Sequence, residues 1–240
     1  MAGLTPAEDN TPSELSRAPA SSSDALIRVL RSGMQLIPFG IGSCIESAYF
    51  GSADDRRISR LEKFIEEVAE EMKKVKDQVR APNEEYFKSD NFAFFFENVI
   101  RRVDTEASNE KLRALRGVLV TILLDQGLAD FDKRSSFLKT IDLVEALHLQ
   151  VLQFLAARSD RSDEERFVSH ATICRRFGAS SEADTNFVYS TLDTLANREF
   201  IISGPVPFDV KNRIDKQRQE FRATALGVEF LRFVRLEGAT

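Results

Sequence analysis

Apolar residues recur at alternating intervals of three and four through residues 58–79, and this spacing constrains the fold more than any other feature of the chain. The positions are Ile58, Leu61, Ile65, Val68, Met72, Val75 and Val79. Such spacing is the a/d seam of a helix that packs on a partner helix. Short connections between helices favour a partner within the same chain. The alternative is a dimer seam, whose partner interface would consist of Ile58, Leu61, Ile65, Val68 and Met72.

Helical spacing continues on both sides of this seam and predicts an all-α domain over residues 24–158. Residues 91–103 carry an apolar stripe of Phe92, Phe95, Phe96, Val99 and Val103. Phe94 falls off that stripe and is therefore a candidate partner anchor. The stretch GVLVTILL at 117–124 is apolar on all sides, which is typical of the centre of a helical bundle. We expect one last long helix over 137–158.

Composition marks both ends of this domain. Residues 1–23 are rich in Pro, Ser, Ala and acidic side chains, which predicts a disordered tail. The run RSDRSDEER is charged and poor in apolar residues, so we place a boundary there and a second domain over 159–240. The N-terminal stretch lacks the basic and apolar regions of a secretory signal, and the two cysteines lie far apart. Both features indicate a cytoplasmic protein.

The small-residue segment LIPFGIGSCIESAYFG at 36–51 invites three interpretations. A phosphate-binding loop would need a third glycine or a lysine at the spacing of the motif, and the residues SCIES that follow Gly42 contain neither. A transmembrane helix would need roughly 20 apolar residues, but Glu46 lies in the middle of this segment. Small residues spaced by four allow two helices to approach closely, so helix packing is favoured. Shallower membrane contact is unlikely on this evidence and stays an alternative.

Catalytic chemistry finds little support in the sequence. The chain has two histidines, His148 and His170, and neither lies in a known catalytic motif. Glu145 and His148 form one Glu-x-x-His unit, which di-iron bundles use twice, and a second unit is absent from the sequence. The cysteines lack metal-binding spacing. We therefore expect a protein that is not an enzyme and that uses no metal or cofactor.

The C-terminal third has a different texture. A short helix ends at Gly178, and a second helix begins with the cap Ser181-x-x-Asp184. The strand-like FIIS, a polar loop containing Pro205 and Pro207, and the final FRATALGVEFLRFV follow. The predicted order is helix, turn, helix, strand, wing, strand, helix.

This part of the chain resembles a winged helix-turn-helix domain. The resemblance rests on LDTLANREFII, at the boundary of the second helix and the first wing strand, and on the ending FRATALGVEFLRF. The ending carries the Thr-x-x-Gly turn and the Phe-Leu pair of such domains, as Thr224, Gly227, Phe230 and Leu231. The expected fold is therefore mainly α, with an N-terminal helical bundle followed by a winged helix that has a small β-wing.

The resemblance implies contact with double-stranded DNA, through the second helix in the major groove and the wing on phosphates. Candidate phosphate contacts are Arg175, Arg176, Lys211, Arg213, Lys216, Arg218 and Arg222. Candidate contacts to bases are Asn186, Tyr189 and Ser190. The second helix departs from the DNA-binding pattern, because it carries Glu182, Asp184 and Asp193 against Arg198. The whole chain has a net charge of −5, so any attraction to DNA must be local.

Two functional hypotheses follow. The first is a bacterial, cytoplasmic regulator whose helical domain oligomerises or senses a partner and whose winged helix contacts DNA. The second is a protein-interaction or stress effector, whose winged helix docks protein and whose segment 36–51 contacts membrane after a change of shape. The basic wing motivates the first hypothesis. The acidic helix and the small-residue segment motivate the second.

Overall fold

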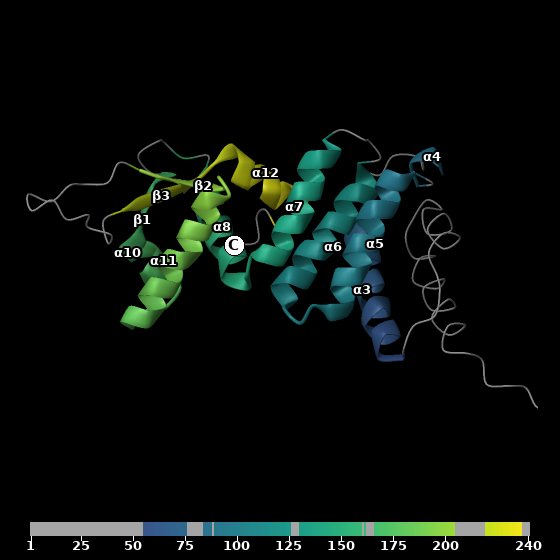
Figure 1. Ribbon diagram of the computed structural model, residues 1–240, viewed down its shortest axis with the longest axis horizontal. Helices are drawn as coiled ribbons and strands as arrows, with labels where there is room; N and C mark the ends of the chain where they lie inside the picture. The colour runs from purple at the N-terminus through teal and green to yellow at the C-terminus, as the bar shows by residue number, and fades with distance from the viewer. Residues whose placement is uncertain are drawn as a thin grey trace, which may run out of the picture.

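The computed structural model shows a mainly helical protein with one small antiparallel sheet, as the sequence predicted (Figure 1). It describes residues 55–75, 84–87, 89–125, 130–159, 161, 166–204 and 219–236. The predicted tail at 1–23, the small-residue segment at 36–51, and four wing residues lie outside these ranges. The four are Lys211, Arg213, Lys216 and Arg218.

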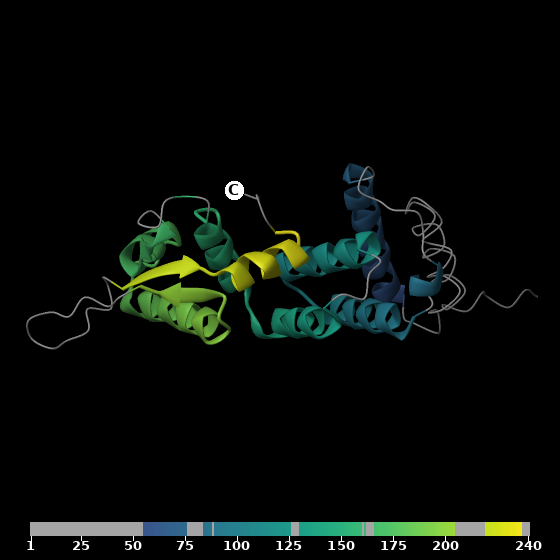
Figure 2. The ribbon, with the colours of Figure 1, turned by 90° about the horizontal axis from the view of Figure 1, so that it is seen from above.

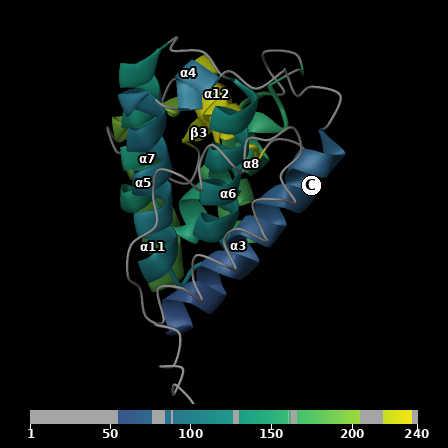
Figure 3. The ribbon, with the colours of Figure 1, turned by 90° about the vertical axis from the view of Figure 1, so that its right-hand side faces the viewer.

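The N-terminal part is built on four helices whose starts are set by local chemistry. They are α3 (Asp55–Lys74), α4 (Glu84–Phe87), α5 (Asp90–Thr105) and α6 (Asn109–Leu124). The hydroxyls of Ser89 and Ser108 accept hydrogen bonds from the backbone N–H groups of Phe92 and Lys111, which caps α5 and α6. Helix α6 is buried along most of its length, so the prediction of a central helix is confirmed. Figure 3 shows α3 lying obliquely across α6, with α5 beside them.

The heptad seam is filled by the chain itself. Helix α3 packs on α5 and α6, and the seam side chains Leu61, Ile65, Val68 and Met72 are buried in the common core. Ile58 lies in α3, and its side chain is outside the part that the structure describes. The four buried side chains are therefore unavailable to a second copy unless α3 leaves the bundle.

The single helix predicted over 137–158 is wrong, because the chain turns within it. Helix α7 ends at Leu143 (Phe131–Leu143) and α8 begins at Ala146 (Ala146–Ala156). Val144 between them is extended, with φ −100° and ψ 141°. The backbone N–H of Glu145 donates to Nδ1 of His148 at 3.0 Å, so the Glu-x-x-His unit caps α8. This cap satisfies the backbone N–H of Glu145, which in a continuous helix would donate to a carbonyl oxygen one turn earlier.

The C-terminal part combines short helices with a three-stranded sheet. Its elements are β1 (Val168–Ser169), α10 (His170–Arg176), α11 (Glu182–Asn197), β2 (Ile201–Ser203), β3 (Glu220–Ala223) and α12 (Ala225–Phe233). The strands are antiparallel in the order β1-β3-β2, with Val168 opposite Phe221 and Ile202 opposite Arg222. Ser181 and Asp184 form the predicted capping box at the start of α11.

Helix α8 belongs to the surroundings of this sheet, because it packs on α11, β3 and α12. Figure 2 shows the sheet, α10 and α11 at one end of the molecule, α3 to α6 at the other, and α12 between them. One hydrophobic core extends through both parts. The domain boundary predicted at 158/159 stays a prediction. A hydrophobic core that both parts share does not show where one folding unit ends and the next begins.

Two contacts fix α12 between the parts. The rings of Phe200 and Phe230 stack with centroids 4.7 Å apart, and Phe137 of α7 lies edge-on to Phe230 at 5.5 Å. Beyond α12, the hydroxyl of Thr121 donates to the carbonyl oxygen of Phe233 at 3.0 Å. The α6 backbone comes so close here that a Cβ added at Gly117 would lie 1.9 Å from the carbonyl oxygen of Val234. Only glycine fits at this crossing.

We predict that Gly117→Ala lowers the free energy of unfolding by about 1–3 kcal/mol, the usual cost of forcing an extra methyl group into a packed site. Helix propensity alone would raise the free energy of unfolding by about 1 kcal/mol. A decrease would therefore show that the backbones of α6 and of Val234 lie close together. Urea denaturation followed by circular dichroism measures this free energy. Arg113→Ala, an exposed change one turn earlier on α6, should stay within about 0.5 kcal/mol of the wild type. A more stable G117A variant would contradict the close approach.

Candidate functional site

The first candidate surface is the exposed side of α10 and α11. Arg175 and Arg176 end α10 and are exposed. Asn186 and Ser190 on α11 are exposed too. These four side chains therefore lie where a ligand could reach them, on neighbouring helices that pack together.

Tyr189, the remaining candidate on α11, is held by its neighbours. Its ring lies edge-on to His170 with centroids 5.7 Å apart. Its hydroxyl donates to Oε1 of Gln219 at 3.4 Å, next to strand β3. The side chain is half-buried, so it contributes to the packing of α11 as well as to the exposed side.

Arg222 is the one predicted wing cation that the structure describes. It lies on β3, half-buried, with its guanidinium carbon 5.1 Å from the centre of the Phe167 ring. A guanidinium over an aromatic face is held by a cation–π interaction. Arg222 is therefore anchored on the sheet.

Acidic and apolar groups interrupt the exposed side of α11. Glu182, Asp184 and Asp193 are exposed. Hydrogen bonds from Ser181 lower the pKa of Asp184, which keeps that carboxylate charged at neutral pH. Phe187 leaves 56% of its surface exposed, the largest exposed fraction among the large apolar residues described. Phe187 was not among the residues predicted from the sequence. The spacing of α11 could have identified it, because it lies next to Val188 and therefore off the apolar stripe.

Phe94, the predicted partner anchor, is only partly available. Its ring packs edge-on against Phe95 at 5.4 Å and near Phe131 at 5.3 Å, and it is half-buried. An exposed rim of this ring can contact a partner, while the rest of it belongs to the core.

Neither histidine lies in a cluster that suits a metal. Among the residues that the structure describes, no group of three or more His, Cys, Asp or Glu side chains could hold an ion. His148 accepts the capping hydrogen bond of Glu145 through Nδ1, so that nitrogen carries no proton. His170 is buried, with Nε2 3.5 Å from Sγ of Cys174. Burial lowers the pKa of both histidines and raises the pKa of Cys174.

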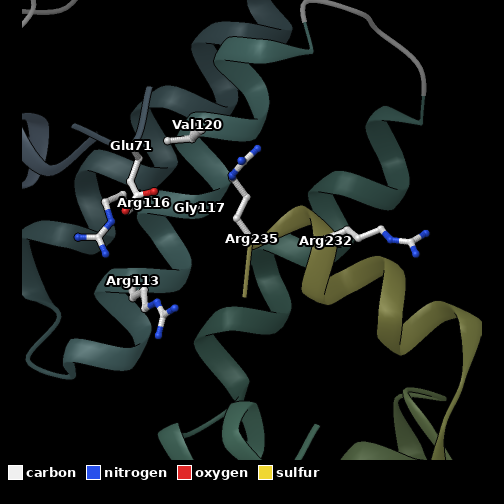
Figure 4. Close-up of a pocket in the computed structure, with 7 residues that line it drawn as sticks. All are labelled: Glu71, Arg113, Arg116, Gly117, Val120, Arg232 and Arg235. Carbon is white, nitrogen blue, oxygen red and sulfur yellow. The ribbon is translucent and has the colours of Figure 1, made fainter. Parts of the chain in front are cut away.

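A second candidate surface is a basic hollow between α6 and the end of α12 (Figure 4). It measures about 420 Å³ and is lined by Glu71, Arg113, Arg116, Gly117, Val120, Arg232 and Arg235. A neighbouring hollow of about 330 Å³ shares Arg113 and Arg116 and adds Arg60 and Lys63 of α3. The sequence analysis missed this group, because its cations come from segments more than a hundred residues apart. No local run of basic residues announces it.

Comparison of the chain with protein-family models, with curated proteins and with solved structures returned no match. Within the described part of the chain, no helix is both long enough and apolar enough to cross a membrane.

We predict that stability falls as the pH is lowered from about 7.5 to about 5.5, because both buried histidines have lowered pKa values in the folded state. The unfolded chain takes up protons near the ordinary value of 6.5, before the folded chain does. His148→Gln keeps an acceptor for the cap and removes one titrating group. Urea unfolding at both pH values should therefore show a smaller decrease for H148Q than for the wild type. Equal decreases would mean that His148 is not a source of the dependence.

Proposed function

We propose that the protein is a non-enzymatic regulator whose C-terminal part is a winged-helix module that contacts DNA. The observation that carries the proposal is the arrangement of α10, a tight turn and α11, followed by two antiparallel strands, β2 and β3, which residues 205–218 separate in the sequence. The turn contains Gly178 at φ +70°, which sets α11 off from α10. This order supports the resemblance drawn from the sequence.

The contact would be made mainly to phosphates. Arg175 and Arg176 are exposed at the end of α10, and the sequence between β2 and β3 contains four further cations. Carboxylates on α11 repel the duplex and leave few side chains, chiefly Asn186 and Ser190, to reach base edges. We therefore expect binding that depends steeply on salt and weakly on DNA sequence.

The helical part would act as the sensing or oligomerising part of this regulator. Its heptad seam is buried within the chain, so an oligomer would use other surfaces, such as the exposed rim of Phe94. We propose that the protein acts in the cytoplasm, in keeping with its two widely separated cysteines.

A second candidate function is protein docking through α11, and the exposed Phe187 favours it. An exposed aromatic ring on a helix that also carries carboxylates suits a surface that receives an apolar and basic partner. On this hypothesis segment 36–51 can also engage a membrane, which flotation of the full-length protein with liposomes would detect.

DNA contact predicts that binding of the full-length protein to a random duplex, followed by fluorescence anisotropy, weakens steeply as salt rises. Arg175→Gln with Arg176→Gln should reduce the slope of log affinity against log salt by about 2, because each arginine that binds a phosphate adds about 1 to that slope. Changing Lys211, Arg213, Lys216 and Arg218 together to Ala should reduce it further.

The matched control is Arg101→Gln with Lys139→Gln, which removes two exposed cations from α5 and α7 and should leave the slope unchanged. If removal of the wing cations left the affinity for DNA and its salt dependence unchanged, the proposal would be contradicted. No binding by the wild type at low salt would favour protein docking instead.

A further inference from the structure

The basic hollow at the end of α12 has a charge that its own carboxylates do not balance. Four arginines and one glutamate line it, although the whole chain has a net charge of −5. Glu71 already pairs with Lys74 at 3.0 Å, and Arg116 pairs with Glu67. Arg113 and Arg235 form no ion pair with any side chain in the described ranges. Their charges are therefore available to an anion from solution.

The backbone at Arg235 adopts a conformation that glycine usually occupies. The N–H of Leu236 donates to the carbonyl oxygen of Leu231 at 2.9 Å, and the N–H of Arg235 donates to that of Arg232 at 3.0 Å. This pair of bonds is a Schellman motif, in which glycine usually occupies the left-handed position. Arg235 occupies that position with φ 50°. Glycine adopts this conformation more readily than other residues, so replacing Arg235 by glycine removes the side chain without straining the backbone.

Contacts with α6 and α8 fix the backbone and the Cβ atom of Arg235. Gln153 of α8 donates from Nε2 to the carbonyl oxygen of Leu236 at 2.6 Å. A Cβ added at Gly117 would lie 3.1 Å from Cβ of Arg235, so the side chain starts directly against α6. The hydrogen bond from Gln153 to Leu236 and the contact with Gly117 thus hold Arg235 at the edge of the hollow.

Figure 4 shows how the side chains are distributed. Arg116 lies beside Glu71, Arg232 extends away from the other three arginines, and Arg113 and Arg235 come from α6 and from the turn after α12. Arg113 is exposed and Arg235 half-buried. Exposed side chains change rotamer within nanoseconds, so the guanidinium group of Arg113 can turn onto an anion bound beside Arg235.

We propose that this hollow binds a small polyphosphate, as the free ion or as the triphosphate of a nucleotide, through Arg113 and Arg235 with support from Arg116. Guanidinium groups bind phosphate oxygens in a bidentate manner. A volume of about 420 Å³ suits a small ligand. Among the described residues, the lining contains no aromatic ring on which a base could stack. The phosphate chain, and not the nucleoside, is therefore what the hollow recognises.

A bound polyphosphate would join the two parts of the molecule. Arg113 belongs to α6 in the helical part, and Arg235 follows α12 of the C-terminal part. An anion held by both strengthens the contact that keeps α12 on α6. Binding would therefore raise the unfolding temperature of the full-length chain. This inference does not depend on DNA contact, because none of the three arginines lies on α10, α11 or the wing.

Isothermal titration calorimetry on the full-length protein at low salt tests the proposal with inorganic triphosphate, ATP and adenosine. Triphosphate and ATP should bind with similar affinity, and adenosine should not bind. No binding of triphosphate would overturn the proposal. Binding of adenosine, or of ATP alone, would overturn the assignment of phosphate recognition. Equal binding of sulfate would reduce the hollow to a non-specific ion site and would overturn it as well.

The decisive variant is Arg235→Gly, because glycine suits the left-handed position and should leave the unfolding temperature of the free protein unchanged or higher. Its affinity for triphosphate should fall by about 10-fold or more, the usual effect of removing a charged hydrogen bond. Arg113→Gln should lower the affinity similarly.

Glu199→Gly is the matched control. Glu199 has φ 59° and occupies the same position of a second Schellman motif, in which the N–H of Phe200 donates to the carbonyl oxygen of Leu195 at 3.0 Å. It lies away from the hollow, so its replacement makes the same backbone change without removing a lining cation. Triphosphate affinity in E199G should equal that of the wild type. An equal decrease in R235G and E199G, or no decrease in R235G, would overturn the role of Arg235.

Discussion

The close crossing of two backbones, α6 at Gly117 and the turn after α12 at Val234, is the constraint on which the arrangement of the molecule depends. Helix–helix distance is set by the side chains at the contact, and a residue without a side chain permits the shortest one. Because the crossing is short, Thr121 reaches the carbonyl oxygen of Phe233 and Gln153 reaches that of Leu236. These bonds satisfy carbonyls at a helix end that would otherwise lack partners. The C-terminal helix thereby becomes part of the helical core.

A second constraint is the break between α7 and α8. The periodicity of apolar residues continues across it, which is why the sequence predicted one helix. The cap made by Glu145 and His148 stabilises a new helix start at this point, and Val144 in the extended conformation changes the direction of the chain. As a result α8 packs on the sheet and on α11. A residue pair that resembled half of a metal site therefore serves the fold.

Charge is divided between two distant surfaces. The exposed side of α11 combines carboxylates with the ring of Phe187, and the end of α10 carries Arg175 and Arg176. The hollow beside α6 collects arginines from both parts of the chain. The two ligands proposed above, DNA at α10 and α11 and a polyphosphate at the crossing of α6 and α12, would therefore bind to separate surfaces. A ligand at the crossing would act on the contact through which the two parts are coupled.

What the sequence determined by itself is the local structure. The seam of α3, the capping box of α11 and the buried centre of α6 follow from spacing and capping, which involve residues within one or two turns. Tertiary structure decided the rest, since it depends on residues distant in the chain. The exposure of Phe187, the burial of the seam by α5 and α6, and the placement of Arg113 and Arg235 around one hollow are properties of packing. No local pattern in the sequence predicts that Gly117 faces Val234. The missing side chain of a glycine affects the fold only where another backbone occupies the space that it leaves.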